Sequence, residues 1–204
     1  MQINMQDLVN MHKPCPAQSF PPRRCSWVNM NNPLYVEYHD TQWGVPEHND
    51  ALLFEMLVLE CFQAGLSWEC VLNKREGFRR AFDNFDLQKI RCYDAAKCQQ
   101  LLANPDIIRN RLKIAACIAN SRIFMEIQEE CGSFDTYIWG FTNRQTIFES
   151  CDIRSTSPLS DRIAKDLKRR GMKFVGSTVI YAYLQAIGII NAHEKNCAWA
   201  VCQQ

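Results

Sequence analysis

Apolar residues recur at helical spacing along most of this chain. The clearest case runs from residue 52 to residue 68, where they recur every three or four positions and then almost fill the helix. A helix that is apolar nearly all round belongs in a core. The pattern therefore predicts a buried central helix that Asn49 or Asp50 caps and that runs to Ala64.

The same reasoning predicts an all-α fold with further helices on both sides of the central one. Asp86 and Asp94 are expected to cap two short helices, and Asn104-Pro105 and Gly171 to interrupt the chain. Residues 142–156 form a loop with a short strand at 146–149. The other predicted helices span residues 33–43, 67–82 (as one or two helices), 87–91, 94–103, 107–130, 133–141, 157–170 and 173–190.

Length and composition fit one domain with a sizeable core. Four of the eight prolines lie within residues 1–24, so we expect a poorly ordered leader there and a single domain at 25–204, with room for two helical lobes. No run of 18 apolar residues and no signal sequence is present, so no membrane span is expected. The odd count of 11 cysteines favours a reducing, cytoplasmic location over a disulfide scaffold.

The formal net charge of +1 neither favours nor excludes nucleic acid, because binding depends on a local patch. One basic run, KDLKRRGMK at 165–173, ends a predicted helix. Such a run is usually a solvated face that complements the helix dipole. The alternative is that it contacts phosphates.

Glu60 interrupts the apolar central helix. A carboxylate in that setting is costly unless another group pairs with it. Flat side chains occur nearby in sequence, and an acid ringed by them suits a flat, electron-poor or cationic ring. The simpler interpretation is that these aromatics belong to the core. The set is Trp27, Tyr35, Tyr38, Trp43 and Trp68.

Two cysteines and two histidines form a candidate metal site: Cys25, His39, His193 and Cys197. The spacing of the second pair places both ligands on one face of a helical turn. Zinc prefers four such nitrogen and sulfur ligands in a tetrahedron. Because cysteines are abundant here, chance pairs are common, and a buried histidine with inert thiols is the alternative.

Residues 101–116 have the pattern of a helix-hairpin-helix. A short helix and a tight break precede a second helix that opens with Arg109, Arg111 and Lys113. Such a hairpin points backbone N–H groups at a DNA phosphate. Pro105-Asp106 replaces the usual hairpin glycine, and a plain turn between packed helices is the alternative.

Four segments resemble the DNA-3-methyladenine glycosylase I family. They occur in the family's order, and the match as a whole runs from Cys25 to about Cys197. Cys61 and Asp106 stand where the family commonly has glycine, and the interval between Cys25 and His39 is one residue longer than usual. The segments are WVNMNNPLYVEYHDTQWGVP (27–46), LFEMLVLECFQAGLSW (53–68), IIRNRLKI (107–114) and GMKFVGSTVIYAYLQAIGIINAH (171–193).

The resemblance implies an all-α helix-hairpin-helix DNA glycosylase with a structural Zn²⁺ that joins the chain ends. Its base-recognising glutamate falls on Glu60, and its pocket aromatics fall on Tyr38, Trp43 and Trp68, with Trp27 and Tyr35 as neighbours. Its zinc ligands fall on Cys25, His39, His193 and Cys197.

The implied activity is excision of 3-methyladenine from alkylated double-stranded DNA by a monomeric, monofunctional enzyme that does not cleave the strand. The leaving base is already cationic, so the enzyme must chiefly unstack, hold and orient it. Two alternatives stay open: a non-catalytic, zinc-stabilised module that senses alkylated bases, and a glycosylase with a shifted range, such as 3-methylguanine.

Overall fold

The computed structural model describes residues 22–149 and 154–200 of the chain. Most of the predicted leader, residues 1–21, lies outside the described residues. Helices dominate the rest, which confirms the all-α prediction. In chain order they are α2 (Pro33–Thr41), α3 (Asp50–Gln63), α4 (Trp68–Leu72), α5 (Arg75–Ala81), the 3₁₀ turn η1 (Asp83–Phe85), α6 (Leu87–Ile90), α7 (Ala95–Ala103), α8 (Arg111–Cys131), α9 (Phe134–Gly140), α10 (Pro158–Arg169) and α11 (Ser177–Ala186).

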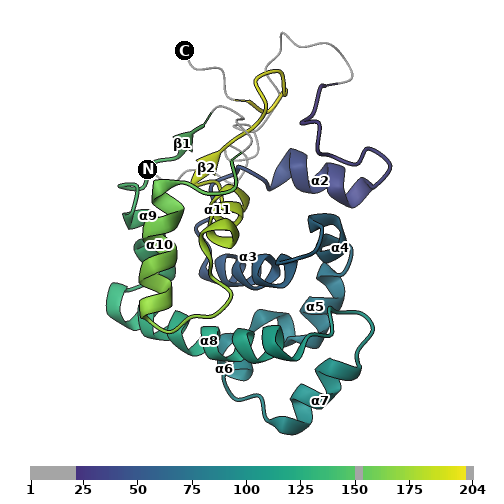
Figure 1. Ribbon diagram of the computed structural model, residues 1–204, viewed down its shortest axis with the longest axis vertical. Coiled ribbons are helices and arrows are strands. Elements are labelled where there is room, and N and C mark those ends of the chain that lie inside the picture. The colour runs from purple at the N-terminus through teal and green to yellow at the C-terminus, as the bar shows by residue number, and fades with distance from the viewer. Residues whose placement is uncertain (1–21, 150–153, 201–204) are drawn as a thin grey trace, which may run out of the picture.

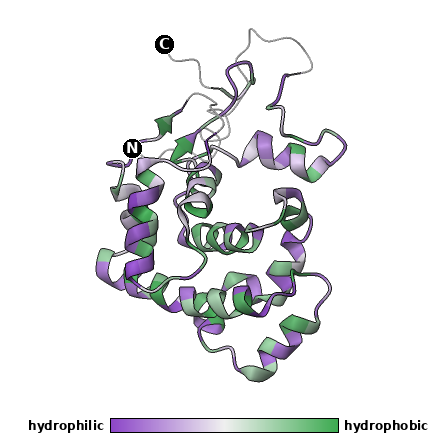
Figure 2. Ribbon diagram, viewed as in Figure 1, coloured by the Kyte–Doolittle hydropathy of each residue, from purple (hydrophilic) through white to green (hydrophobic). Residues whose placement is uncertain are grey.

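The central helix is α3, as predicted. Every residue from 53 to 62 is buried, and α4, α8, α9 and α11 all contact the helix. α9 and α10 lie at one end of α3, whereas α4 and α5 lie at the other (Figure 1). The turns of α3 that are visible in Figure 2 are mostly green, whereas α10 shows large purple segments beside green ones. Each fully buried Leu or Phe contributes roughly 1.5–3 kcal/mol, so this helix supplies much of the core energy.

Side-chain caps set the helix starts where the sequence predicted them. The Asn49 side chain accepts hydrogen bonds from the backbone N–H groups of Ala51 and Leu52 at 2.9 and 3.3 Å. Asp86 and Asp94 cap α6 and α7 in the same way. Each cap contributes about 1 kcal/mol, and the Asn49 cap fixes the residue at which α3 begins.

Two helix starts were predicted too early. The helix predicted from 107 begins at Arg111, after an Asn110 cap, because residues 104–110 turn on Asn104-Pro105. The helix predicted from Lys173 begins at Ser177. Both backbone groups of Lys173 bond instead to the side chain of Asn120, at 2.8 and 3.0 Å. Residues 173–176 therefore form a bent segment beside α8, in which Phe174 has a φ of 57°.

A small sheet connects the segment after α9 with the segment after α11. The strand predicted at 146–149 is confirmed as β1 (Ile147–Phe148), and it pairs in parallel with β2 (Ile190–Asn191), whose first residue was predicted as the end of the last helix. Gly188 ends the helical region with a positive φ of 73°. A Cβ at Gly188 would lie 2.2 Å from the backbone of Val45, so the C-terminal segment packs directly on the segment after α2. No helix in the described ranges is long and apolar enough to cross a membrane.

Candidate active site and metal cluster

Four side chains from three helices meet at the α4 end of α3. We call them the Glu60 cluster: Tyr35 and Tyr38 from α2, Glu60 from α3 and Trp68 from α4. Tyr35 and Tyr38 share a face of α2 because they are three residues apart. The rings of Tyr38 and Trp68 are in contact, with centroids 5.0 Å apart and planes at 43°. The structure thus brings together these four predicted site residues.

The two buried acids of α3 differ in their surroundings. Glu55 binds the guanidinium groups of Arg75 and Arg79, and Arg75 also donates to the side chain of Gln42 at 2.5 Å. This network ties α2, α3 and α5 together. Glu60 has no such partner, and burial alone raises its pKa to about 8. An unpaired buried acid lowers the stability of the fold. Of the two acids, Glu60 is therefore the candidate functional residue.

The Glu60 cluster contains buried polar atoms that have no hydrogen-bond partner. Among the described residues, the buried side-chain atoms without a hydrogen-bond partner are Glu60 Oε2, Trp68 Nε1 and His193 Nε2. The first two belong to the Glu60 cluster and present one acceptor and one donor. Native proteins leave few such atoms unpaired. An acceptor and a donor held this way are suited to a ligand that carries the complementary pair.

The position of Trp68 depends on the turn after α3. Gly65 has a φ of 80°, a left-handed conformation that other residues rarely adopt, and Ser67 caps α4. Glu69 then fastens α4 to the segment before α2. One of its carboxylate oxygens accepts hydrogen bonds from Asn29 and Asn32 at 2.8 and 2.7 Å. Sequence reasoning missed this tie.

Replacing Glu69 with alanine should loosen α4, because both asparagine donors lose their acceptor. We expect the KM for alkylated DNA, the substrate that the family resemblance implies, to rise three- to tenfold, corresponding to roughly 1 kcal/mol, with a smaller change in kcat. The matched control is Glu69→Gln, which keeps an acceptor oxygen and should stay within about twofold of wild type. Equal loss of function in both variants would show that the charge of Glu69, not the tie, matters.

The predicted metal ligands also come together. The candidate ligand atoms of Cys25, His39, His193 and Cys197 all lie within 4.8 Å of one another, and all four residues are buried. A metal bound about 2.0–2.3 Å from each ligand fits in a cluster of this size. The cluster joins the segment before α2 to the segment after β2 and could hold a metal ion.

The groups around the cluster orient both imidazole rings. His39 Nδ1 lies 2.8 Å from Asp40 Oδ1, and Arg24 in turn binds Asp40. His193 Nδ1 lies 2.9 Å from the side-chain oxygen of Asn191, which leaves the orphaned Nε2 facing the ligand set. Burial lowers the pKa of His193 to about 4, and the Cys25 thiol lowers the pKa of Cys197. Neutral imidazole and thiolate are the forms that bind metal.

Two predicted base-contacting aromatics pack on this cluster. The ring of Trp43 lies 4.6 Å from that of His193 and 4.9 Å from that of Trp27. Trp27 also contacts His39 and Tyr35, at 5.2 and 5.5 Å between centroids. A continuous row of rings therefore runs from the metal cluster to the Glu60 cluster. Within it, Tyr35 interacts with Glu60, and Trp43 packs on His193 of the metal cluster.

Comparison with known proteins identifies the family to which this chain belongs. The model of the methyladenine glycosylase family matches residues 27–200. This chain belongs to the methyladenine glycosylase family. It is 41% identical over 178 residues to DNA-3-methyladenine glycosylase 1 of Escherichia coli, covering 85% of this chain and 95% of that protein. It is 39% identical over 179 residues to DNA-3-methyladenine glycosylase of Haemophilus influenzae, covering 85% and 96%.

Solved structures of the methyladenine glycosylase family have the same fold. A crystal structure of 3-methyladenine DNA glycosylase I is 43% identical and superposes with a TM-score of 0.82, covering 86% of this chain and 98% of that one. A variant of such an enzyme in complex with 3-methyladenine is 29% identical with a TM-score of 0.83, covering 87% and 97%. The predicted helical glycosylase fold is therefore confirmed.

In the structure, two features of the predicted hairpin do not suit a phosphate contact: the position of Lys113 and the cap of α8. Lys113 is 6% exposed, and its Nζ donates to the carbonyl oxygens of Phe62 and Ala64 at 2.8 and 2.6 Å. It therefore caps the C-terminal end of α3 rather than facing DNA. Asn110 occupies the first N–H groups of α8, so few remain for a phosphate. The prediction of a phosphate contact by Lys113 does not fit this position.

The hairpin also packs on α5. A Cβ at Gly77 would lie 2.3 Å from the carbonyl oxygen of Asp106, so the turn and the helix are in direct contact. Lys74 donates to the carbonyl oxygen of Pro105 at 2.7 Å, and Arg80 pairs with Asp106 at 3.3 Å. The acid at the hairpin turn thus has a cationic neighbour. The side chains of Arg109 and Arg111 are exposed and make no hydrogen bond or ion pair to any described residue.

Proposed function

We propose that this chain is a DNA-3-methyladenine glycosylase, which hydrolyses the N-glycosidic bond of 3-methyladenine in alkylated double-stranded DNA. The observation that carries the proposal is that the buried Glu60 carboxylate and the buried indole N–H of Trp68 both lack a hydrogen-bond partner, while Tyr38 interacts with both residues. Relatives named for this activity, and a solved neighbour in complex with 3-methyladenine, support the choice of base.

The two unmatched atoms complement an adenine edge. Adenine presents an amino donor next to a ring-nitrogen acceptor. Glu60 would accept from the amino group, and Trp68 Nε1 would donate to the ring nitrogen. The Tyr38 and Trp68 rings already touch, so no third ring fits between them, and the base would stack on a free aromatic face. Tyr35 is half-buried and the most exposed member, so we expect the base to arrive past it.

Charge supplies the selectivity. With a pKa of about 8, Glu60 is mostly protonated at neutral pH when the site holds no base. A cationic base favours the ionised form, so binding would release a proton and create an ion pair in a dry site. Neutral adenine carries no positive charge, so its binding would not favour ionised Glu60 and would form no ion pair. Trp68 adds a cation–π contribution of about 0.5–2 kcal/mol, again only for the cation.

The chemistry that follows requires little of the protein. A cationic purine is a good leaving group, so holding it flipped out of the stack and admitting water to the sugar carbon suffices. No Schiff base is proposed. Lys113 reaches the end of α3 beside the cluster, but its Nζ is held by two carbonyl oxygens and is not placed as a nucleophile. The enzyme would therefore be monofunctional.

The metal cluster is proposed to hold structural Zn²⁺. Two thiols and two imidazoles are the ligands zinc prefers, and the orphaned Nε2 of His193 and the oriented His39 fit a tetrahedral ion. Bound zinc would link the chain ends and support the row Trp43–Trp27–Tyr35 behind the Glu60 cluster. It takes no part in the chemical step.

Leu66 is a further candidate that sequence reasoning missed. It is 42% exposed in the turn that carries Trp68. An apolar side chain beside the site can fill the space that a flipped nucleotide leaves in the duplex. We include it in the proposed DNA-facing surface together with Arg109 and Arg111.

Arg109 and Arg111 are proposed to contact phosphates. Replacing both with alanine should reduce the slope of log affinity against log salt by about two units, one per contact, with no change in the base released. Fluorescence anisotropy on an undamaged duplex at several salt concentrations measures this. Lys113→Ala serves as contrast: it should lower thermal stability and leave the slope unchanged. An unaltered slope in the double variant would remove the hairpin from the interface.

Release of free bases from methylated DNA tests the function itself. Incubated with alkylated duplex, the protein should release 3-methyladenine, identified by chromatography, and leave the strand intact until alkali treatment. Binding without any released base would favour the non-catalytic module. Release of 3-methylguanine at a comparable rate would establish the shifted range instead.

A further inference from the structure

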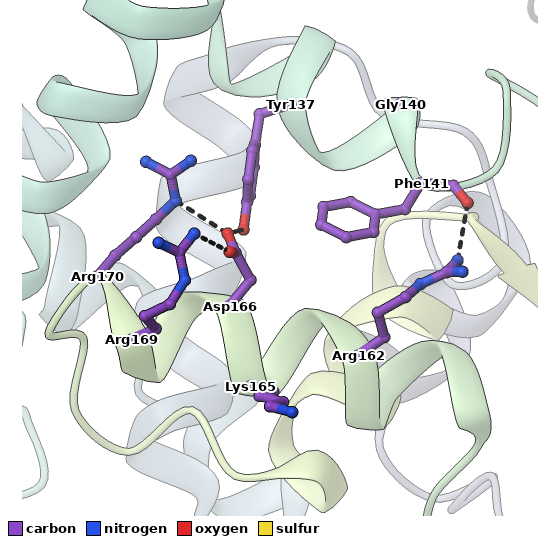
Figure 3. A pocket seen from close by; sticks show the side chains of 8 residues that line it. All are labelled: Tyr137, Gly140, Phe141, Arg162, Lys165, Asp166, Arg169 and Arg170. Atoms are coloured by element: carbon purple, nitrogen blue, oxygen red, sulfur yellow. Dashed lines mark hydrogen bonds and ion pairs between the residues drawn. The ribbon is translucent and has the colours of Figure 1, made fainter.

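A groove between α9 and α10 carries a second group of cations (Figure 3). It encloses about 550 Å³, and Gly140 leaves its wall open, with nothing within 4 Å of an added Cβ. The lining holds one carboxylate, Asp166, and four cations: Arg162, Lys165, Arg169 and Arg170. The lining thus has a net charge of +3, whereas the whole chain has +1. The rest of the protein is therefore net negative, and the groove is a local basic surface.

Part of this cation group is fixed in place by internal pairs. Asp166 accepts hydrogen bonds from the Tyr137 hydroxyl at 2.8 Å, from Arg169 at 2.5 Å and from Arg170 at 2.9 Å. Arg170 also pairs with Glu130 outside the groove. These contacts hold Arg169 and Arg170 in one geometry. Less side-chain conformational entropy would therefore be lost when a ligand binds to them.

The other two cations lack a carboxylate partner within the described ranges. Arg162 donates to a backbone carbonyl oxygen, that of Phe141, at 3.1 Å, and its guanidinium lies 5.7 Å from the Phe141 ring. Lys165 is exposed and makes no contact of this kind. Both can therefore accept an anion without first breaking an ion pair. This distinguishes them from an ordinary solvated face laced with salt bridges.

The groove also has an aromatic side. The rings of Tyr137 and Phe141 meet edge to face, with centroids 5.3 Å apart, and the Phe141 side chain points into the space between the helices (Figure 3). A ring bordered by arginine and lysine can stack a base while the cations bind its phosphates. This combination is typical of surfaces that bind single-stranded nucleic acid. An acidic peptide would use the cations but gain less from the ring.

The groove is separate from the Glu60 cluster. α9 is fastened to the start of α3, where Asp50 accepts from the backbone N–H groups of Phe134 and Asp135 at 2.9 and 2.8 Å. Glu60 lies ten residues further along α3, which is about 15 Å at 1.5 Å per residue. A nucleotide flipped into the Glu60 cluster cannot also occupy the groove.

We propose that the α9–α10 groove is a second nucleic-acid site, which binds an unpaired DNA segment through Arg162, Lys165 and the Phe141 ring while the Glu60 cluster holds a damaged duplex. Such a site would let the protein hold two DNA segments at once. It requires no new chemistry and does not depend on which base is excised.

The test uses the full-length protein already saturated with a duplex that contains an abasic-site analogue. A fluorescent ten-nucleotide oligothymidylate is then titrated and followed by anisotropy. We expect wild type to bind it in a salt-dependent manner, and Lys165→Glu and Phe141→Ala each to weaken binding by at least fivefold. Single-turnover excision on a short methylated duplex should stay within twofold of wild type, so this site can fail without the excision activity failing.

Lys168→Glu is the matched control, because Lys168 is exposed on the same helix but does not line the groove. It should weaken oligothymidylate binding by less than twofold. Equal weakening by Lys165→Glu and Lys168→Glu would show a diffuse charge effect and overturn the proposal. So would wild-type binding too weak to measure, or displacement of the oligonucleotide by equimolar polyglutamate, which would identify an acidic protein segment as the preferred occupant.

Discussion

Glu60→Gln is expected to lower single-turnover excision of 3-methyladenine by ten- to a hundredfold while the protein folds normally. Glutamine keeps the shape and one acceptor oxygen but cannot ionise opposite a cationic base. A hydrogen bond to a charged group in a buried setting contributes about 1.5–3 kcal/mol, and that difference corresponds to the stated loss. Full activity in this variant would mean that Glu60 is a structural acid and that the base binds elsewhere.

The pH dependence provides a sharper signature of the same role. In wild type, kcat/KM should rise with pH, reach half of its plateau near pH 8 and level off above it, because the free enzyme must lose the Glu60 proton and the pKa of that carboxyl is about 8. The Gln variant should lack this rise. Measuring excision from pH 5.5 to 9, with spontaneous depurination subtracted, tests both profiles. A profile of the same shape in both proteins would assign the titration to another group.

Stability should change in the opposite direction from activity. The folded pKa of Glu60, about 8, lies above its ordinary value of 4.5, so the folded state holds the proton more tightly than the unfolded state. This favours folding below pH 4.5 and is lost as the pH rises towards 8. Glu60→Gln should therefore raise the melting temperature at pH 8, by an amount that reflects a few kcal/mol.

Glu55→Gln is the matched comparison on the same helix. Glu55 has two arginine partners, and its loss leaves buried guanidinium groups without their carboxylate. We expect this variant to be less stable than wild type at every pH and to keep the rise in kcat/KM. Two buried acids five residues apart would then give opposite stability changes, which separates a structural acid from a functional one.

Glu55 and Glu60 also show which features of the fold and the site can be predicted from the sequence. The apolar run and its Asn49 cap are local properties, so α3 and its register were predictable. Glu60 stood out because it is charged within that run. Glu55 lies in the same run, yet nothing local indicates that Arg75 and Arg79 neutralise it, because its partners lie about twenty residues away on another helix.

The errors have the same origin. Lys113 was assigned to DNA from its place after the hairpin break, but the end of α3 offers it two carbonyl oxygens. The last helix was predicted from Lys173, but Asn120 on α8 takes up both backbone groups of that residue. In each case a distant partner decided the outcome over local propensity. Residue type and spacing made the four metal ligands candidates, and the family resemblance decided between a metal site and a chance grouping, because the ligands lie at opposite ends of the domain.

Removal of the metal is expected to have the largest effect on stability. Purified protein should contain one zinc per chain, and Cys197→Ser should lower the melting temperature by about 10–20 °C. His39 and Cys197 are 158 residues apart, and closing a loop of that length stabilises a fold by about 5 kcal/mol in a chain-entropy description. For a domain of this size, each kcal/mol shifts the melting temperature by about 2–4 °C.

The effect should be separable from catalysis and from the loss of any cysteine. Well below its melting temperature, Cys197→Ser should keep excision per folded molecule within a fewfold of wild type, because Cys197 contacts no member of the Glu60 cluster. Cys98→Ser, on α7 away from the metal ligands, should retain its zinc and its melting temperature. Elemental analysis showing no stoichiometric zinc in protein purified without chelators, or equal melting temperatures for wild type and Cys197→Ser, would contradict a structural zinc site. The four residues would then be a buried polar cluster whose hydrogen bonds alone join the chain ends.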